Sequence, residues 1–159
     1  MLLEVPRGLT PAIVAEHLKK IDCVLKCVTA SHSHEDHLSV SAWTKLQKRF
    51  SDARFMHPSH VRRRMSFTLG GETGWLIPSP KHSTDDLVAV FRGVAMTGDI
   101  ELGTLESVND EVDLETKKRS FKRLKSFPER HKYQIHTVMS AHCNDYRENV
   151  NWRSLFSLG

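Results

Sequence analysis

The chain has 159 residues, of which 39% are hydrophobic and 26% charged, a composition typical of one ordinary globular domain. It lacks the run of about 18 apolar residues that a membrane span needs, and its first residues do not resemble a signal peptide, so we expect a cytoplasmic protein. The net charge is +4, but the basic residues are not strongly clustered, so neither nucleic acid nor a membrane surface is expected as a partner.

Strands and helices are predicted to alternate in the first part of the chain. In chain order, we expect a strand over 2–5, a helix over 10–21, a strand over 23–29, a helix over 41–50 and a strand over 53–56. Thr10 supplies a hydroxyl N-cap and Pro11 suits the first helical position. The run over 23–29 is rich in β-branched and apolar residues, so Cys23 and Cys27 are expected to be small buried side chains on one face of that strand.

The second part of the chain continues the alternation. We expect strands over 67–69, 75–77, 87–91, 94–97 and 135–140, a charged helix over 113–127 and a short last helix over 149–156. Gly70-Gly71 and Arg92-Gly93 are typical of tight connections between paired strands. Pro128 is expected to end the charged helix, whose basic side chains are interpreted as a solvated face. The alternation indicates the α/β class.

A histidine cluster follows the predicted strand over 23–29. Within six residues the chain carries three imidazoles and two carboxylates, and four of these side chains are the candidate ligands: His32, His34, Asp36 and His37. His32 and His34 are two residues apart, so they project to one side of an extended segment. Imidazole nitrogen and carboxylate oxygen are suitable metal ligands. A solvated turn is the alternative, but the three imidazoles would repel one another when protonated, and all four groups would be costly to desolvate without a metal.

Three more candidate ligands follow other predicted strands. They are His82, Asp99 and His142, each near the carboxyl end of a strand, where α/β folds usually place their chemistry. Any one of them alone would be interpreted as a surface or capping residue. Their occurrence together, in this order after the histidine cluster, favours a metal site.

These residues resemble the signature of the metallo-β-lactamase superfamily, with a glyoxalase-II-like pattern. His32-x-His34-x-Asp36-His37 matches the HxHxDH motif, and Thr97-Gly98-Asp99 matches its Thr-Gly-Asp motif. Pro80-Lys81-His82-Ser83 is similar to Pro-Gly-His-Thr, and Ser140-Ala141-His142, which precedes Cys143, is similar to the final Gly-His. The match runs from about residue 23 to residue 143.

The resemblance implies a fold and a set of ligands. The fold would be a four-layer αββα sandwich formed by residues 1–159 as a single domain. His32, His34 and His82 would bind a first metal ion, and Asp36, His37 and His142 a second. Asp99 would bridge the two ions. Zinc is the expected metal, and iron or manganese would also suit nitrogen and oxygen ligands.

The resemblance also implies an activity. Two divalent ions would hold a hydroxide that attacks a thioester, a lactone or a related small ester, and Asp36 could also act in catalysis by orienting that nucleophile or protonating the leaving group. Asp99 disfavours true β-lactamases, which generally lack this bridging aspartate. Lys81 and the arginines at 62–64 could hold an anionic substrate group, but each is expected to be an ordinary surface charge.

Three alternatives stay open at this point. They are a mononuclear iron oxygenase of the persulfide dioxygenase kind, a phosphodiesterase or nuclease, and a non-catalytic protein that keeps the fold. Only 31 residues precede His32, so the domain is expected to lack the usual first strands and to have a reduced first sheet. The exposed surface of such a sheet could be covered by a second copy of the chain in a homodimer.

Overall fold

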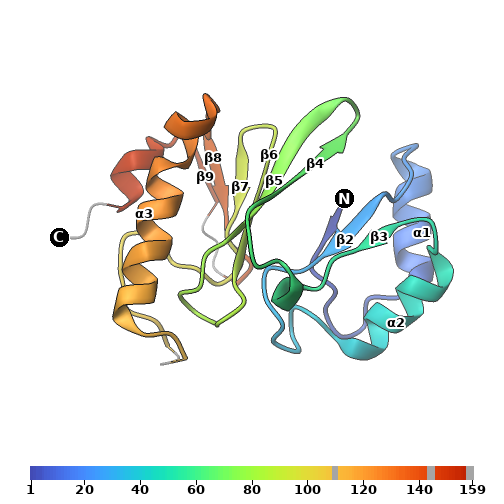
Figure 1. The fold of residues 1–159 in the computed structure, drawn as a ribbon. Helices are drawn as coiled ribbons and strands as arrows, with labels where there is room; N and C mark the ends of the chain where they lie inside the picture. Colours follow the sequence, from blue (N-terminus) through green and yellow to red (C-terminus); the bar gives the residue numbers. More distant parts are fainter. Residues whose placement is uncertain (109–110, 143–145, 157–159) are drawn as a thin grey trace. The chain divides into compact units, whose positions relative to one another are not determined.

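The computed structural model describes residues 1–108, 111–142 and 146–156. It divides into two compact units, Met1–His60 and Val61–Gly159, which are described separately below. Within the described residues, each unit has one β-sheet and at least one α-helix, which confirms the predicted α/β class (Figure 1). Every helix in the described part of the chain is too short or too polar to cross a lipid bilayer.

The first unit is a short parallel sheet with two helices. Its strands lie in the order β1 (Leu2–Leu3), β2 (Cys27–Thr29) and β3 (Arg54–Phe55), and all neighbours are parallel. Parallel neighbours need long connections, which here contain α1 (Pro11–Lys20) and α2 (Val40–Arg49). Both helices lie on the same side of the sheet (Figure 1). The small first sheet expected from the sequence is therefore present.

The core of the first unit forms where the helices meet the sheet. Thr10 Oγ1 accepts a hydrogen bond from the Ile13 backbone N–H at 3.3 Å, which confirms the predicted cap of α1. Val14 from α1 and Leu46 from α2 are buried in one apolar cluster with Val28 of β2. This packing supports the strand that leads into the histidine cluster.

The strand predicted over 23–29 is shorter than expected. Only residues from Cys27 onward pair, because β1 and β3 beside them are two residues long. Cys23 and Val24 precede the paired region and are exposed, so the expectation of a buried Cys23 is wrong. Cys27 is buried as expected, and burial raises the pKa of its thiol above the ordinary value.

The second unit contains a six-stranded sheet in sequence order. Its strands are β4 (Met65–Leu69), β5 (Glu72–Pro78), β6 (Leu87–Phe91), β7 (Val94–Met96), β8 (Thr137–Met139) and β9 (Tyr146–Glu148). The pair β7–β8 is parallel and the other pairs are antiparallel. The two predicted tight connections are present, and Arg92 and Gly93 both have positive φ angles, as a hairpin turn requires. Strand β9 was not predicted from the sequence.

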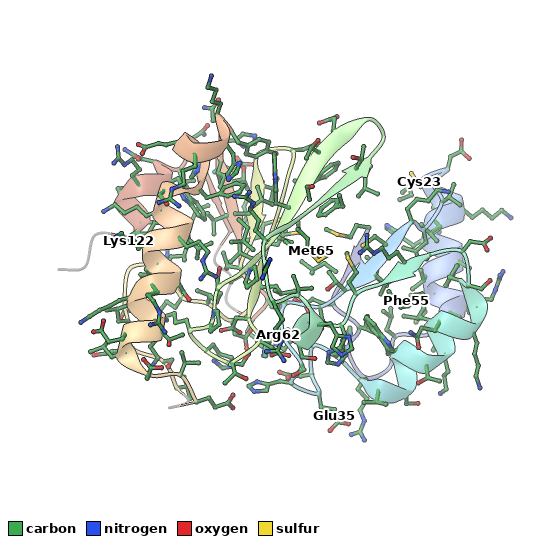
Figure 2. All side chains as sticks on the ribbon, in the orientation of Figure 1. Cys23, Glu35, Phe55, Arg62, Met65 and Lys122 are labelled. Carbon is green, nitrogen blue, oxygen red and sulfur yellow. The ribbon has the colours of Figure 1, made fainter. Side chains whose placement is uncertain are left out.

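One long helix, α3 (Leu114–His131), packs on this sheet. Phe121, Leu124 and Phe127 are buried in one cluster with Ile77 and Val88 of the sheet. The exposed basic face was expected, and Lys122 points away from the sheet (Figure 2). The basic run is not wholly solvated, however, because Lys117 is buried and its Nζ donates to Ser107 Oγ at 2.7 Å.

The predicted end of this helix at Pro128 is wrong. The helix continues through Pro128 to His131, and Lys132 then ends it with a left-handed backbone conformation. Proline has no N–H, so it cannot donate to the carbonyl of Leu124 four residues earlier. The indole Nε1 of Trp152 donates to that carbonyl instead, at 2.7 Å. Trp152 belongs to η2 (Trp152–Phe156), a 3-10 helix where a helix over 149–156 had been expected.

Candidate metal centre

The first unit holds the histidine cluster in the loop that follows β2. The ring of His32 lies 4.5 Å from the ring of His34 and 4.1 Å from that of His37, between centroids. His32 and His37 are buried, whereas histidine side chains in general are only intermediate in burial. The loop therefore gathers three potential nitrogen ligands at one point, as the spacing of the motif predicted.

Glu4 and Ser31 hold two of these rings in place. Ser31 Oγ lies 3.0 Å from His32 Nδ1, and Glu4 Oε2 lies 3.4 Å from His37 Nδ1. The Glu4 carboxylate also accepts the backbone N–H of Ser31, at 3.2 Å from Oε2. A carboxylate on one ring nitrogen fixes the orientation and tautomer of a metal-binding histidine. Sequence reasoning missed Glu4, because nothing in the local pattern links it to a residue 33 positions later (37 − 4).

The tertiary structure explains how Glu4 reaches the loop. Val5 forms a parallel bridge with Leu38, and its backbone N–H donates to the His37 carbonyl at 2.7 Å. The chain after β1 thus runs beside the end of the histidine loop. Glu4 adopts φ of +75°, in the left-handed region that non-glycine residues rarely occupy. The backbone of Glu4 is therefore strained at the same residue whose side chain contacts His37 in the candidate site.

Asp36 and Glu35 are neighbours with different surroundings. Asp36 Oδ2 lies 3.6 Å from His37 Nε2, and its side chain is 58% exposed. Glu35 points outward at the tip of the loop (Figure 2) and is 3.8 Å from Arg7 in an exposed ion pair. Of the two carboxylates, Asp36 is the one placed against a predicted ligand, in agreement with the motif.

The second unit brings its three predicted ligands together. Asp99 Oδ2 lies 3.6 Å from His82 Nε2 and 3.7 Å from His142 Nε2. The sheet explains this arrangement. Because strand β6 is antiparallel to β7, the loop before β6 lies beside the end of β7. Because β8 is parallel to β7, strands β7 and β8 end at the same edge of the sheet. The backbone bond from Ala141 N–H to the Gly98 carbonyl, 2.9 Å long, joins these two ends.

Asp86 and Lys81 are buried beside His82 in the loop between β5 and β6. Burial raises the pKa of the Asp86 carboxyl, and hydrogen bonds from the loop oppose that shift. Burial likewise lowers the pKa of the Lys81 ammonium, which donates to the Glu106 carbonyl at 2.7 Å. The interpretation of Lys81 as a surface charge is therefore wrong. The arginines at 62–64 are exposed, as expected of ordinary surface charges.

The donor atoms of both sets suit a divalent metal ion. Each set consists of imidazole nitrogens with at least one carboxylate, which are ligands for zinc, iron or manganese. The first unit supplies His32, His34, Asp36 and His37, and the second supplies His82, Asp99 and His142. The meeting of the two sets stays a prediction. Cys143, the neighbour of the last predicted ligand, lies outside the described residues.

Comparison with solved structures identifies the fold. A metallo-β-lactamase from Pontibacter korlensis matches with a TM-score of 0.62 and 16% identity, over 98% of this chain and 76% of that one. ETHE1 from Myxococcus xanthus matches with a TM-score of 0.60 and 18% identity, over 86% and 62%. A metallo-β-lactamase family protein from Thermus thermophilus matches with a TM-score of 0.58 and 16% identity, over 96% of this chain and 66% of that one.

The comparisons of sequence alone are negative. No family model matches the chain, and no curated protein matches it significantly. Identities of this size between structures show a shared fold and leave the activity open. The resemblance drawn from the four motifs and the structural matches point to the same conclusion, which is that this chain has the metallo-β-lactamase fold.

Proposed function

We propose that this protein is a metal-dependent hydrolase in which the two units form one metallo-β-lactamase-type domain. One divalent ion would be bound by His32, His34 and His82, a second by Asp36, His37 and His142, and Asp99 would bind both. The observation that carries this proposal is the way each unit gathers its own predicted ligands. Three imidazoles lie together in the first unit, and Asp99 lies between two more in the second.

The expected substrate is a thioester, a lactone or a related small ester. When bound, a pair of divalent ions would supply a water of lowered pKa and a Lewis acid that polarises the scissile carbonyl. The side chains of the protein must then orient the metal ligands and transfer a proton to the leaving group. Glu4 and Ser31 support the orientation of His37 and His32 through the Nδ1 atoms of those rings. Asp36 is the candidate catalytic residue, because its largely exposed carboxylate can accept a proton and pass it to the leaving group.

The test combines metal analysis with a substrate panel on one preparation. Protein purified without added metal should contain two divalent ions per chain, with zinc the first expectation. It should cleave a thioester, a lactone or a p-nitrophenyl ester. Asp99→Ala should lose second-site occupancy and turnover together. The matched control is Asp113→Ala, since Asp113 is an exposed carboxylate that caps α3 through the Thr116 N–H at 2.8 Å.

Other outcomes would replace this proposal by a different one. Retention of two tightly bound ions in Asp99→Ala would refute the bridging role. One iron per chain together with oxygen uptake would indicate an oxygenase. Turnover of bis(p-nitrophenyl) phosphate without any ester turnover would indicate a phosphodiesterase. A folded, metal-loaded protein that cleaves none of these substrates would indicate a non-catalytic member of the fold.

A further inference from the structure

The Asp86 carboxylate is surrounded by the backbone of the loop that carries His82. Its Oδ2 accepts three consecutive backbone N–H groups, from Lys81 at 2.9 Å, His82 at 2.6 Å and Ser83 at 2.8 Å. Its Oδ1 accepts the hydroxyl of Ser83 at 2.9 Å. The residue is 2% exposed. A buried carboxylate is costly, and here this turn of the chain satisfies it with four hydrogen bonds.

This arrangement constrains the backbone at His82. Three successive N–H groups converge on one oxygen only when the segment folds into a compact concave turn. The carboxylate therefore selects one conformation of residues 81–83, and that conformation sets the direction in which the His82 side chain leaves the backbone. In the same conformation, His82 Nε2 lies 3.6 Å from Asp99 Oδ2. We propose that Asp86 is a positioning residue that presents His82 to the metal centre.

Other contacts hold a different part of the same loop. The Ser79 backbone N–H donates to the Asp86 carbonyl at 2.7 Å, and Ser120 Oγ of α3 donates to the Pro80 carbonyl at 2.9 Å. These bonds fasten the base of the loop, where it leaves β5 and joins β6. The Asp86 side chain acts at the tip, on the ligand residue itself. Ser120→Ala is therefore a matched control, because it weakens the same loop without touching its tip.

The inference rests on the proposed function, so its first test measures zinc affinity by competition with a chromophoric chelator. Asp86→Ala should bind zinc about 10- to 100-fold more weakly than the wild type, the usual loss when a supporting partner of a ligand is removed. Asp86→Asn should recover most of that affinity, because its amide oxygen can still accept the three N–H groups. Ser120→Ala should bind zinc as the wild type does. The visible spectrum of the cobalt-substituted protein should change in Asp86→Ala and in neither of the other variants.

A second measurement needs neither metal nor a stable alanine variant. Amide hydrogen exchange in the metal-free wild type should be slow at Lys81, His82 and Ser83, and faster at these three amides in Asp86→Asn, whose neutral oxygen is a weaker acceptor. Fast exchange at these amides in the wild type, while the amides of β6 stay protected, would overturn the positioning role.

The outcomes separate this inference from the proposed function. A wild type that binds zinc, with Asp86→Ala binding it equally well, overturns the role of Asp86 and leaves the hydrolase proposal standing. Equal losses in Asp86→Ala and Ser120→Ala would show a general effect of loop stability and would also overturn it. A wild type that binds no divalent metal refutes the proposed function and this inference together.

Discussion

Replacing Trp152 with Phe should destabilise the second unit by more than the loss of ring size explains. The indole Nε1 of Trp152 donates at 2.7 Å to the Leu124 carbonyl, which has lost its helical partner because residue 128 is proline. Both Trp152 and Leu124 are buried, so no water replaces the lost donor readily. A buried acceptor left unsatisfied costs about 1–3 kcal/mol. We expect a loss of that size in the free energy of unfolding, in addition to the packing cost of the smaller ring.

A double-mutant cycle with Pro128→Ala isolates the hydrogen bond. Alanine at 128 restores an N–H that can donate to the Leu124 carbonyl along the helix. In that background Trp152→Phe should cost only the change in packing, so the two substitutions should couple by about 1–2 kcal/mol. Urea unfolding followed by circular dichroism gives the four free energies without depending on tryptophan fluorescence. Equal costs of Trp152→Phe in both backgrounds would show that the indole does not replace the missing helical donor.

Two further predictions concern charged groups. Glu4→Gln should weaken zinc binding by about 10- to 100-fold, because His37 loses the carboxylate beside its Nδ1. Glu35→Gln, in an exposed part of the same loop, is the control, and equal zinc affinities for the two variants would contradict the role of Glu4. His131 has a pKa lowered below its ordinary value of 6.5 by burial and by neighbouring arginines, so its protonation favours the unfolded chain. The free energy of unfolding should therefore fall more steeply in the wild type than in His131→Gln as the pH drops below about 6.5. Urea titrations at several pH values measure this, and the same pH dependence of the free energy in both proteins would contradict the prediction.

Several features of the fold could be predicted because they depend on neighbouring residues. The cap at Thr10 acts over three residues, and the hairpin at Arg92-Gly93 needs only two with positive φ. The histidine cluster is of the same kind, because its three imidazoles lie within six residues of one another in the sequence. The boundaries were less accurate, because the extent of a strand such as β2 depends on the length of its neighbours.

The sequence by itself determined the alternation of strands and helices, the four motifs that carry the predicted ligands and their order along the chain. Only the tertiary structure decided which residues, distant in sequence, satisfy several of the polar groups inside the protein. Glu4 reaches Ser31 across 27 positions, Lys81 reaches Glu106 across 25, and Trp152 reaches Leu124 across 28. A periodic pattern of apolar residues in the sequence indicates which side chains are buried. It does not report which distant donor meets which acceptor, because that pairing exists only once the chain has folded.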